Sequence, residues 1–281
     1  MTVIATTIPT LAPNWPDSWK LSHHFDRIEV GGEQPRIGYA RMYSERRRRV
    51  LAAVAQLAGG PADILDIAAA QGNFSIAVAA MGHRVTWNDF RGELADYVRL
   101  KMPAGLEMAF VPGNILEVEA EYQSRFDVVM ALEVIEHVAH PDAFLRALSA
   151  LVKPGGHIIV STPNGGYVMN NLPRFSDCPD ASIFEDAQFK PDSDGHIFLL
   201  HEDEMRDQAA LAGLNVVRHD LFNNPLTCGH MKSGRLLPWL PDALVRALEW
   251  LTAHLPRALS RKVNAASLTI LQRPRGGAAR A

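Results

Sequence analysis

The stretch Ala62-Asp-Ile-Leu-Asp-Ile-Ala-Ala-Ala-Gln-Gly-Asn-Phe74 decides the fold of this chain. Its first part, residues 62–67, is short, apolar and rich in Ile and Leu, which predicts a β-strand. A turn of small residues, 68–72, follows, and from Asn73 the apolar residues recur at helical spacing. A strand, a tight turn of small residues and a helix form the first half of a nucleotide-binding βαβ unit, in which the backbone approaches a ligand at the helix N-terminus.

The residues of this turn narrow the class of ligand. A dinucleotide-binding turn carries the pattern Gly-x-Gly-x-x-Gly, whereas the three positions here hold Ala68, Ala70 and Asn73. What remains is an acidic residue, Asp66, followed by small residues and Gly72. This pattern resembles motif I of the class I S-adenosylmethionine (SAM)-dependent methyltransferases, with two of the usual glycines replaced by alanine. Taken alone, the stretch also fits a generic α/β turn.

The rest of the chain alternates strands and helices at the spacing of a parallel sheet. We expect the further strands at 83–88, 108–111, 126–132, 157–161, 214–220 and 266–272, and helices at 38–58, 91–101, 141–152 and 202–212. The resemblance implies an α/β, Rossmann-like fold with a seven-strand, mostly parallel sheet, helices on both faces and an antiparallel edge strand.

The length of 281 residues suits one large α/β domain with additions. We expect an N-terminal arm at 1–37 that is irregular over 1–20, a SAM-dependent methyltransferase domain at 38–272 and a disordered tail at 273–281. Two insertions, at about 165–200 and 223–262, interrupt the alternation. The polar, Pro-rich stretch within the first predicts a lid or a substrate loop.

In the second insertion, four leucines share one face of a predicted helix, namely Leu244, Leu248, Leu251 and Leu255. We expect this face to pack on the core or on a second subunit. A peripheral helix on a membrane surface is the alternative, because residues 236–240 add apolar bulk and an aromatic side chain. A run of four arginines, 46–49, is expected to form a solvated helix face, with binding of an acidic substrate as the alternative.

The composition is that of a soluble globular protein, with 47% apolar and 21% charged residues. A net charge of −3 argues against a dedicated nucleic-acid binder, which usually carries a basic face. Cys178 and Cys228 lack Cys-x-x-Cys spacing and are expected to be free thiols in a reducing cytosol, so a cytoplasmic location is predicted. We expect no signal peptide and no transmembrane helix, since no apolar run approaches 18 residues.

An acidic residue stands at the end of the second predicted strand. Asp89 can accept hydrogen bonds from both ribose hydroxyls of a nucleotide, and the alternative is a cap for the next helix. The resemblance implies that SAM is held by Asp66, Gly72, Asp89 and Asn114 and that Ala68, Phe74 and Ile115 line its site. Asn114 would meet the adenine amino group, and an ordinary Gly-Asn turn is the alternative there.

The motif Glu133-Val-Ile-Glu136-His137 follows the fourth predicted strand. Glu136 and His137 lie three and four residues after Glu133. In a helix this spacing places both carboxylates and the imidazole on one face, at the ligand-binding edge of the sheet. A solvated first helical turn is the alternative. The motif is similar to that of the ubiquinone-biosynthesis O-methyltransferases and the small-RNA 3′-terminal 2′-O-methyltransferases. The resemblance implies a divalent-metal site of Glu133, Glu136, His137 and His196, with His201 as a competitor for the last place.

The resemblance implies a SAM-dependent O-methyltransferase that acts on a hydroxyl of a small molecule or a glycan. A divalent metal would lower the pKa of that hydroxyl, with Glu133 and His137 as the catalytic residues. This O/N donor set does not choose among Mg, Mn, Fe, Co and Zn. His137 or His140 could act instead as a general base without metal. The alternatives are an RNA 3′-terminal 2′-O-methyltransferase, a metal-independent N- or C-methyltransferase, and a non-catalytic partner protein with a SAM fold.

Overall fold

The computed structural model describes residues 7–33, 37–188, 195–231 and 233–275. Its strands are β1 (Asp63–Ile67), β2 (Arg84–Asp89), β3 (Ala109–Pro112), β4 (Phe126–Leu132), β5 (Val152–Pro163), β6 (Asn215–Phe222) and β7 (Ala266–Gln272). Its α-helices are α1 (Asp17–Glu29), α2 (Ile37–Leu57), α3 (Asn73–Ala80), α4 (Leu94–Lys101), α5 (Glu119–Tyr122), α6 (Pro141–Leu151), α7 (Glu202–Leu211), α8 (Asp242–Ala253) and α9 (Arg257–Val263).

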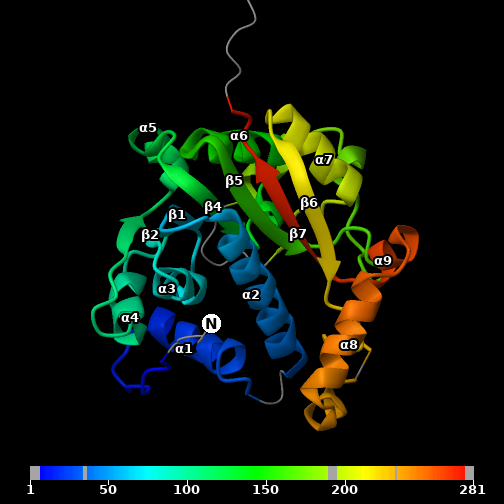
Figure 1. The fold of residues 1–281 in the computed structure, drawn as a ribbon, viewed down its shortest axis with the longest axis horizontal. Helices are drawn as coiled ribbons and strands as arrows, with labels where there is room; N and C mark the ends of the chain where they lie inside the picture. The colour runs from blue at the N-terminus through cyan, green and yellow to red at the C-terminus, as the bar shows by residue number, and fades with distance from the viewer. Residues whose placement is uncertain (1–6, 34–36, 189–194, 232, 276–281) are drawn as a thin grey trace, which may run out of the picture.

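The seven strands form one sheet in the order β3-β2-β1-β4-β5-β7-β6 (Figure 1). The first five strands in this order are parallel, and β7 runs antiparallel to both of its neighbours. The prediction of a seven-strand, mostly parallel sheet that includes an antiparallel strand is therefore confirmed, although that strand was expected at the edge. The antiparallel strand lies one place in from the edge, between β5 and β6.

Helices cover both faces of the sheet, as predicted (Figure 1). On one face, Leu145 of α6 and Met205 of α7 pack with the inward side chains of β1, β4 and β5. On the other face, Val54 of α2 and Val78 of α3 pack with the alternate residues of the same strands. Since β1, β2 and β4 are parallel and in register, their carboxyl ends meet at one edge of the sheet.

The N-terminal arm is helical from Asp17, so the prediction of irregular structure over residues 1–20 is wrong there. The buried side of α1 includes Ser22, His23 and Asp26, which do not give the apolar periodicity of an ordinary surface helix. Residues 1–6 lie outside the described residues, as do 276–281 of the predicted disordered tail.

The leucine face of α8, expected to pack on the core or on a second subunit, does not pack into the core at Leu244 and Leu251. Leu244 and Leu251 are about half exposed, whereas Val245 and Glu249 on another face are buried. Hydrogen bonds of Glu249 fix this orientation of α8. Its carboxylate accepts from the backbone N–H of Asn223 (2.9 Å) and from the Thr227 hydroxyl.

Two further expectations can be compared with the described part of the chain. Cys178 and Cys228 are both free, as predicted. Among the described residues, no helix has the length and hydropathy needed to cross a membrane.

Candidate active site

A cavity of about 220 Å³ opens where β1 and β4 end, at the carboxyl edge of the sheet. Of the predicted SAM residues, Asp66, Ala68 and Phe74 line this cavity. Gly72, Asp89, Asn114 and Ile115 lie outside its lining. Several further lining residues, from α1, α2 and the β1–α3 turn, were not predicted to bind SAM, among them Glu29, Tyr39, Arg46 and Gln71.

The β1–α3 turn keeps a glycine-like backbone although two of its residues are alanines. Ala68, Ala70 and Gly72 have φ angles of +52°, +49° and +69°. This left-handed region is costly for any residue with a Cβ atom. The turn is tied to β2, because Ala69 N donates to Asn88 O (2.8 Å) and Ala70 N donates to Asp89 Oδ2 (2.8 Å).

Asp66 is buried at the floor of the cavity. The hydroxyl of Ser75, on α3, donates to Asp66 Oδ2 over 2.5 Å. Burial, with a smaller contribution from the nearby Asp89 carboxylate, raises the pKa of Asp66 to about 7. The group is therefore a buried hydrogen-bond acceptor that changes charge near neutral pH.

Asp89 and Asn114 both make local backbone contacts. Asp89 Oδ1 accepts hydrogen bonds from Arg91 N (3.0 Å) and Arg91 Nε (2.9 Å). Because Asp89 Oδ2 accepts from Ala70 N, the carboxylate links the β1–α3 turn to the residues that follow β2. Asn114 Oδ1 accepts from Leu116 N (3.1 Å), as in the ordinary turn considered above. Ile115 is buried in the core beneath β1 and β4. Contacts of Asp89 with ribose, and of Asn114 and Ile115 with adenine, stay predictions.

Glu133 does not begin a helix, and the prediction that Glu133, Glu136 and His137 share one helical face is wrong. Glu133 has φ +58°, and only a three-residue 3-10 turn, η2 (Ile135–His137), follows it. Tertiary contacts hold this conformation. The Ser161 hydroxyl donates to Glu133 Oε1 (2.9 Å), and Arg46 Nη1 lies 2.8 Å from Glu133 Oε2.

Arg46 is buried, so the predicted solvated face of the arginine run 46–49 is wrong at this position. Its guanidinium lines the cavity and pairs with Glu133, whereas Arg48 is exposed and bonds to Glu45. A signal was present in the sequence. Arg46 falls at helical spacing between the buried residues Tyr43 and Val50, on the inward face of α2.

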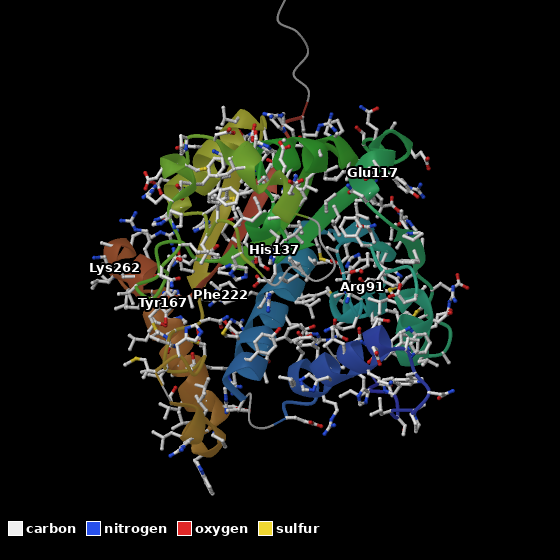
Figure 2. All side chains as sticks on the ribbon, turned by 180° about the vertical axis from the view of Figure 1, so that it is seen from behind. Arg91, Glu117, His137, Tyr167, Phe222 and Lys262 are labelled. Carbon is white, nitrogen blue, oxygen red and sulfur yellow. The ribbon has the colours of Figure 1, made fainter. Side chains whose placement is uncertain are left out.

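Glu136, His137 and His196 come together beside the cavity, with one potential ligand atom from each within 4.8 Å of the others. Figure 2 places His137 near the centre of the molecule, at the carboxyl edge of the sheet. Two contacts hold the cluster: Ile197 N donates to Glu136 O (2.8 Å), and His137 Nδ1 lies 3.1 Å from Gly195 O. His201 instead caps the N-terminus of α7.

The cluster has the chemistry of a divalent-cation site. Glu136 is buried, and its Oε2 accepts from the Thr162 hydroxyl (3.0 Å), while its Oε1 has no hydrogen-bond partner among the described residues. Burial, followed by the neighbouring Glu133, raises the pKa of Glu136 well above its ordinary value. A cation would satisfy this oxygen. Burial and then His137 lower the pKa of His196, which favours the neutral imidazole that a metal requires.

A second cavity, of about 570 Å³, lies on the other side of Glu133. His196, Tyr167, Met169 and His230 line it, and Glu133 is common to both cavities. The two spaces therefore meet at one carboxylate beside the histidine cluster.

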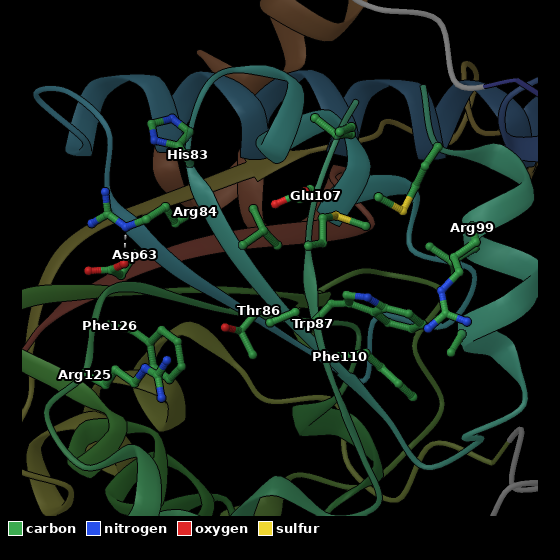
Figure 3. A pocket seen from close by; sticks show the side chains of 17 residues that line it. Asp63, His83, Arg84, Thr86, Trp87, Arg99, Glu107, Phe110, Arg125 and Phe126 are labelled. Atoms are coloured by element: carbon green, nitrogen blue, oxygen red, sulfur yellow. Dashed lines mark hydrogen bonds and ion pairs between the residues drawn. The ribbon is translucent and has the colours of Figure 1, made fainter. Parts of the chain in front are cut away.

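The largest cavity described, about 730 Å³, lies between β2, β3 and α4 and reaches the amino ends of β1, β2 and β4 (Figure 3). Asp63, Arg84 and Phe126, which begin β1, β2 and β4, line it. Arg84 Nε is bonded to Asp63 over 2.7 Å. Ligands of open parallel sheets bind at the carboxyl ends of the strands, so this cavity is not the candidate active site.

Comparisons with known proteins show the family and the fold of the chain. A ubiquinone biosynthesis O-methyltransferase of Proteus mirabilis is 32% identical over 124 residues, which are 40% of this chain and 51% of that protein. The corresponding protein of Xanthomonas euvesicatoria is 36% identical over 110 residues, 39% of this chain and 45% of that protein. The matches thus span about half the length of these relatives.

A solved S-adenosylmethionine dependent methyltransferase from Mesorhizobium loti superimposes with a TM-score of 0.56 at 15% identity, covering 83% of this chain and 98% of that one. At this identity the likeness establishes the fold alone. Residues 40–219 match the family described as a methyltransferase domain. Because that match spans more than half of the chain, the protein belongs to the methyltransferase domain family.

Proposed function

We propose that the protein is a SAM-dependent O-methyltransferase that methylates a hydroxyl of a small molecule or a glycan with the help of a divalent metal. The observation that carries the proposal is the position of Glu133, which borders both the cavity beside Asp66 and the cavity beside His196. A methyl donor in the first cavity and an acceptor in the second would meet at this carboxylate. Family membership and the ubiquinone biosynthesis O-methyltransferase relatives support the reaction class.

The charges of the first cavity complement the amino-acid part of SAM. Arg46 would face the carboxylate of SAM, while Glu29 would face its ammonium group. Asp89, next to the β1–α3 turn, would accept hydrogen bonds from the ribose. Both charged groups of the amino-acid part would thus have a partner of opposite sign, which is the condition for burying them.

Glu136, His137 and His196 would hold the metal. A divalent cation supplies Lewis acidity, which lowers the pKa of an acceptor hydroxyl. Thr162 orients the Glu136 carboxylate, and the carbonyl of Gly195 orients the His137 ring. Glu133 lies outside this cluster, so its carboxylate is the group placed to take up the proton that the hydroxyl releases.

Methyl transfer from isotope-labelled SAM to a panel of catechols and vicinal diols tests the proposal. We expect transfer to depend on divalent metal and to fall by about 10²-fold or more on exhaustive chelation, because a Lewis acid contributes several kcal/mol. Adding metal back should restore it. Full activity after chelation would favour the metal-independent alternative. Salt-sensitive transfer to RNA 3′ ends would favour the RNA methyltransferase.

We propose further that residues 223–262 touch an anionic membrane surface from which an apolar acceptor could enter. This segment holds six Lys and Arg but only two Asp and Glu, in a chain whose net charge is −3. Its apolar side chains are unusually exposed, with Trp239 at 84% and Leu236 at 66%. The exposed Met169 lines the second cavity, and its neighbour Val168 donates from its backbone to Lys262 O (3.0 Å) of α9.

Sedimentation with vesicles tests this contact. We expect binding to vesicles with about one third anionic lipid and little binding to neutral ones. Replacing Leu236 and Trp239 by Ser should lower the binding by about tenfold or more, because each buried apolar side chain contributes roughly 1.5–3 kcal/mol. The control is Leu211→Ser on α7, where an equally exposed leucine (63%) lies outside the segment. Equal losses in both variants, or a dimer that covers the segment, would contradict the proposal.

A further inference from the structure

We propose that the buried ion pair between Asp26 and Lys101 positions the cofactor turn, defined as residues 68–73, by holding Ala68 and Ala70 in their left-handed conformations. The inference rests on the proposed SAM site and deepens it. Asp26 lies on α1 and Lys101 ends α4, so two helices from outside the βαβ unit meet beneath the turn. Both side chains are 0% exposed.

The Lys101 ammonium group bonds directly to the cofactor turn. It donates to Gln71 O over 2.7 Å and to Asn73 Oδ1 over 2.6 Å. The remaining contact is with Asp26, at 2.8 Å from Oδ2 and 2.9 Å from Oδ1. An ammonium group has three donors, so two of the three are used by the turn.

Asp26 completes the same network from α1. Its Oδ1 accepts from Asn73 Nδ2 (2.8 Å), and its Oδ2 accepts from the Tyr97 hydroxyl (2.6 Å). A second contact from α1 reaches the turn, because Gln71 Nε2 donates to Glu29 Oε2 (2.7 Å). The main chain at Gln71 and the side chain of Asn73 are thus fixed on either side of Gly72.

The role of the pair follows from what the turn would do without it. Alanine in the left-handed region tends to return to a right-handed or extended conformation, which glycine does not. The chain has Ala68 and Ala70 where motif I usually has glycine, and both keep φ near +50°. A buried ion pair contributes little net stability compared with apolar side chains of the same size. Its bonds to Gln71 and Asn73 instead fix the backbone that borders the cofactor cavity.

The variant Asp26→Asn/Lys101→Met tests the inference, because it removes both charges together and leaves no unpaired one. We expect the variant to stay folded with a somewhat lower melting temperature, because it leaves no unpaired charge although Gln71 O and Asn73 Oδ1 lose their donor. The Kd for SAM should rise about tenfold or more, because releasing each left-handed alanine shifts the equilibrium by roughly an order of magnitude. Calorimetry gives the Kd and scanning calorimetry the melting temperature.

Restoring SAM binding with glycine distinguishes an effect on the conformation of the cofactor turn from a general loss of stability. Adding Ala68→Gly and Ala70→Gly to this variant should return the Kd to within about threefold of the value that the same glycines give in the otherwise natural chain. Asp17→Asn/Lys20→Met is the matched control, because it removes an exposed ion pair of α1 that lies outside the network. It should leave the Kd unchanged. A folded charge-free variant with the natural Kd, or one that the glycines do not rescue, would overturn the inference.

Asn73→Ala serves if the charge-free variant fails to fold, since it keeps the two charges paired and removes the bonds of the Asn73 amide to Lys101 and to Asp26. We expect weaker SAM binding that the two glycines rescue, and an unchanged Kd would overturn the inference. A natural chain that binds no SAM would overturn the proposed function as well. A natural chain that binds SAM, with variants that bind it equally well, would overturn this inference alone.

Discussion

Asp66→Asn is expected to bind SAM about 10- to 10²-fold more weakly than the natural chain, because a buried hydrogen bond to a charged acceptor contributes roughly 1.5–3 kcal/mol. The Asp66 carboxylate lines the cavity that we propose for SAM and accepts from Ser75 in the first turn of α3. An amide has nearly the same shape but carries no charge. Calorimetric titration with SAM at pH 8, where the natural carboxylate is ionised, measures the difference.

The same variant should be more stable than the natural chain, which separates a binding defect from misfolding. The pKa of Asp66 is raised to about 7 in the fold, against about 3.9 in an unfolded chain. Between these values the folded state binds more protons, so the stability of the natural chain falls as pH rises from about 4 to 7. Asp66→Asn has no ionisable group at this position and keeps this part of the free energy of unfolding, which is on the order of 4 kcal/mol above pH 7. A variant that is less stable at pH 8, or that binds SAM normally, would contradict the assignment.

Glu136→Gln combined with His137→Ala is expected to abolish metal binding and to lower methyl transfer by about 10²- to 10³-fold, with SAM affinity nearly unchanged. The two side chains supply two of the three potential ligands in the cluster, and neither lines the cavity beside Asp66. Titration with a divalent metal, followed by titration with SAM, measures both affinities on one sample.

His140→Ala is the matched control for this variant. His140 lies three residues beyond His137, where its Nε2 is 2.7 Å from Glu185 and outside the cluster. We expect the control to bind metal as the natural chain does. Stoichiometric metal binding by the double variant would show that the cluster is not the metal site.

The strands were predictable because strands buried on both faces give continuous apolar runs. Residues 126–132 and 266–272 were expected as strands, and both have the predicted bounds. The conformation of Glu133 was not predictable in the same way. Its left-handed backbone depends on Ser161 and Arg46, which are distant in the sequence. The spacing of Glu136 and His137, three and four residues after Glu133, fits a helix and could not indicate a short 3-10 turn.

In the candidate site, too, features with a local sequence signal were predictable and features that depend on distant residues were not. Asp66 could be expected from the motif at the end of the first strand. The grouping of Glu136, His137 and His196 was implied by the family resemblance, which had also included Glu133 as a ligand. Arg46 was hidden within a basic run, although its spacing from Tyr43 and Val50 gave a usable signal. The Asp26–Lys101 pair had no such signal, because its partners are 75 residues apart and lie on helices with polar buried residues.

Calorimetric titration of the natural chain with SAM, before and after removal of divalent metal, tests the central claim most directly. We expect one SAM site per chain in both samples and a separate, stoichiometric event when a divalent metal is added to the chelated protein. That event should be lost in Glu136→Gln/His137→Ala and retained in His140→Ala. The absence of SAM binding in both samples would contradict the account.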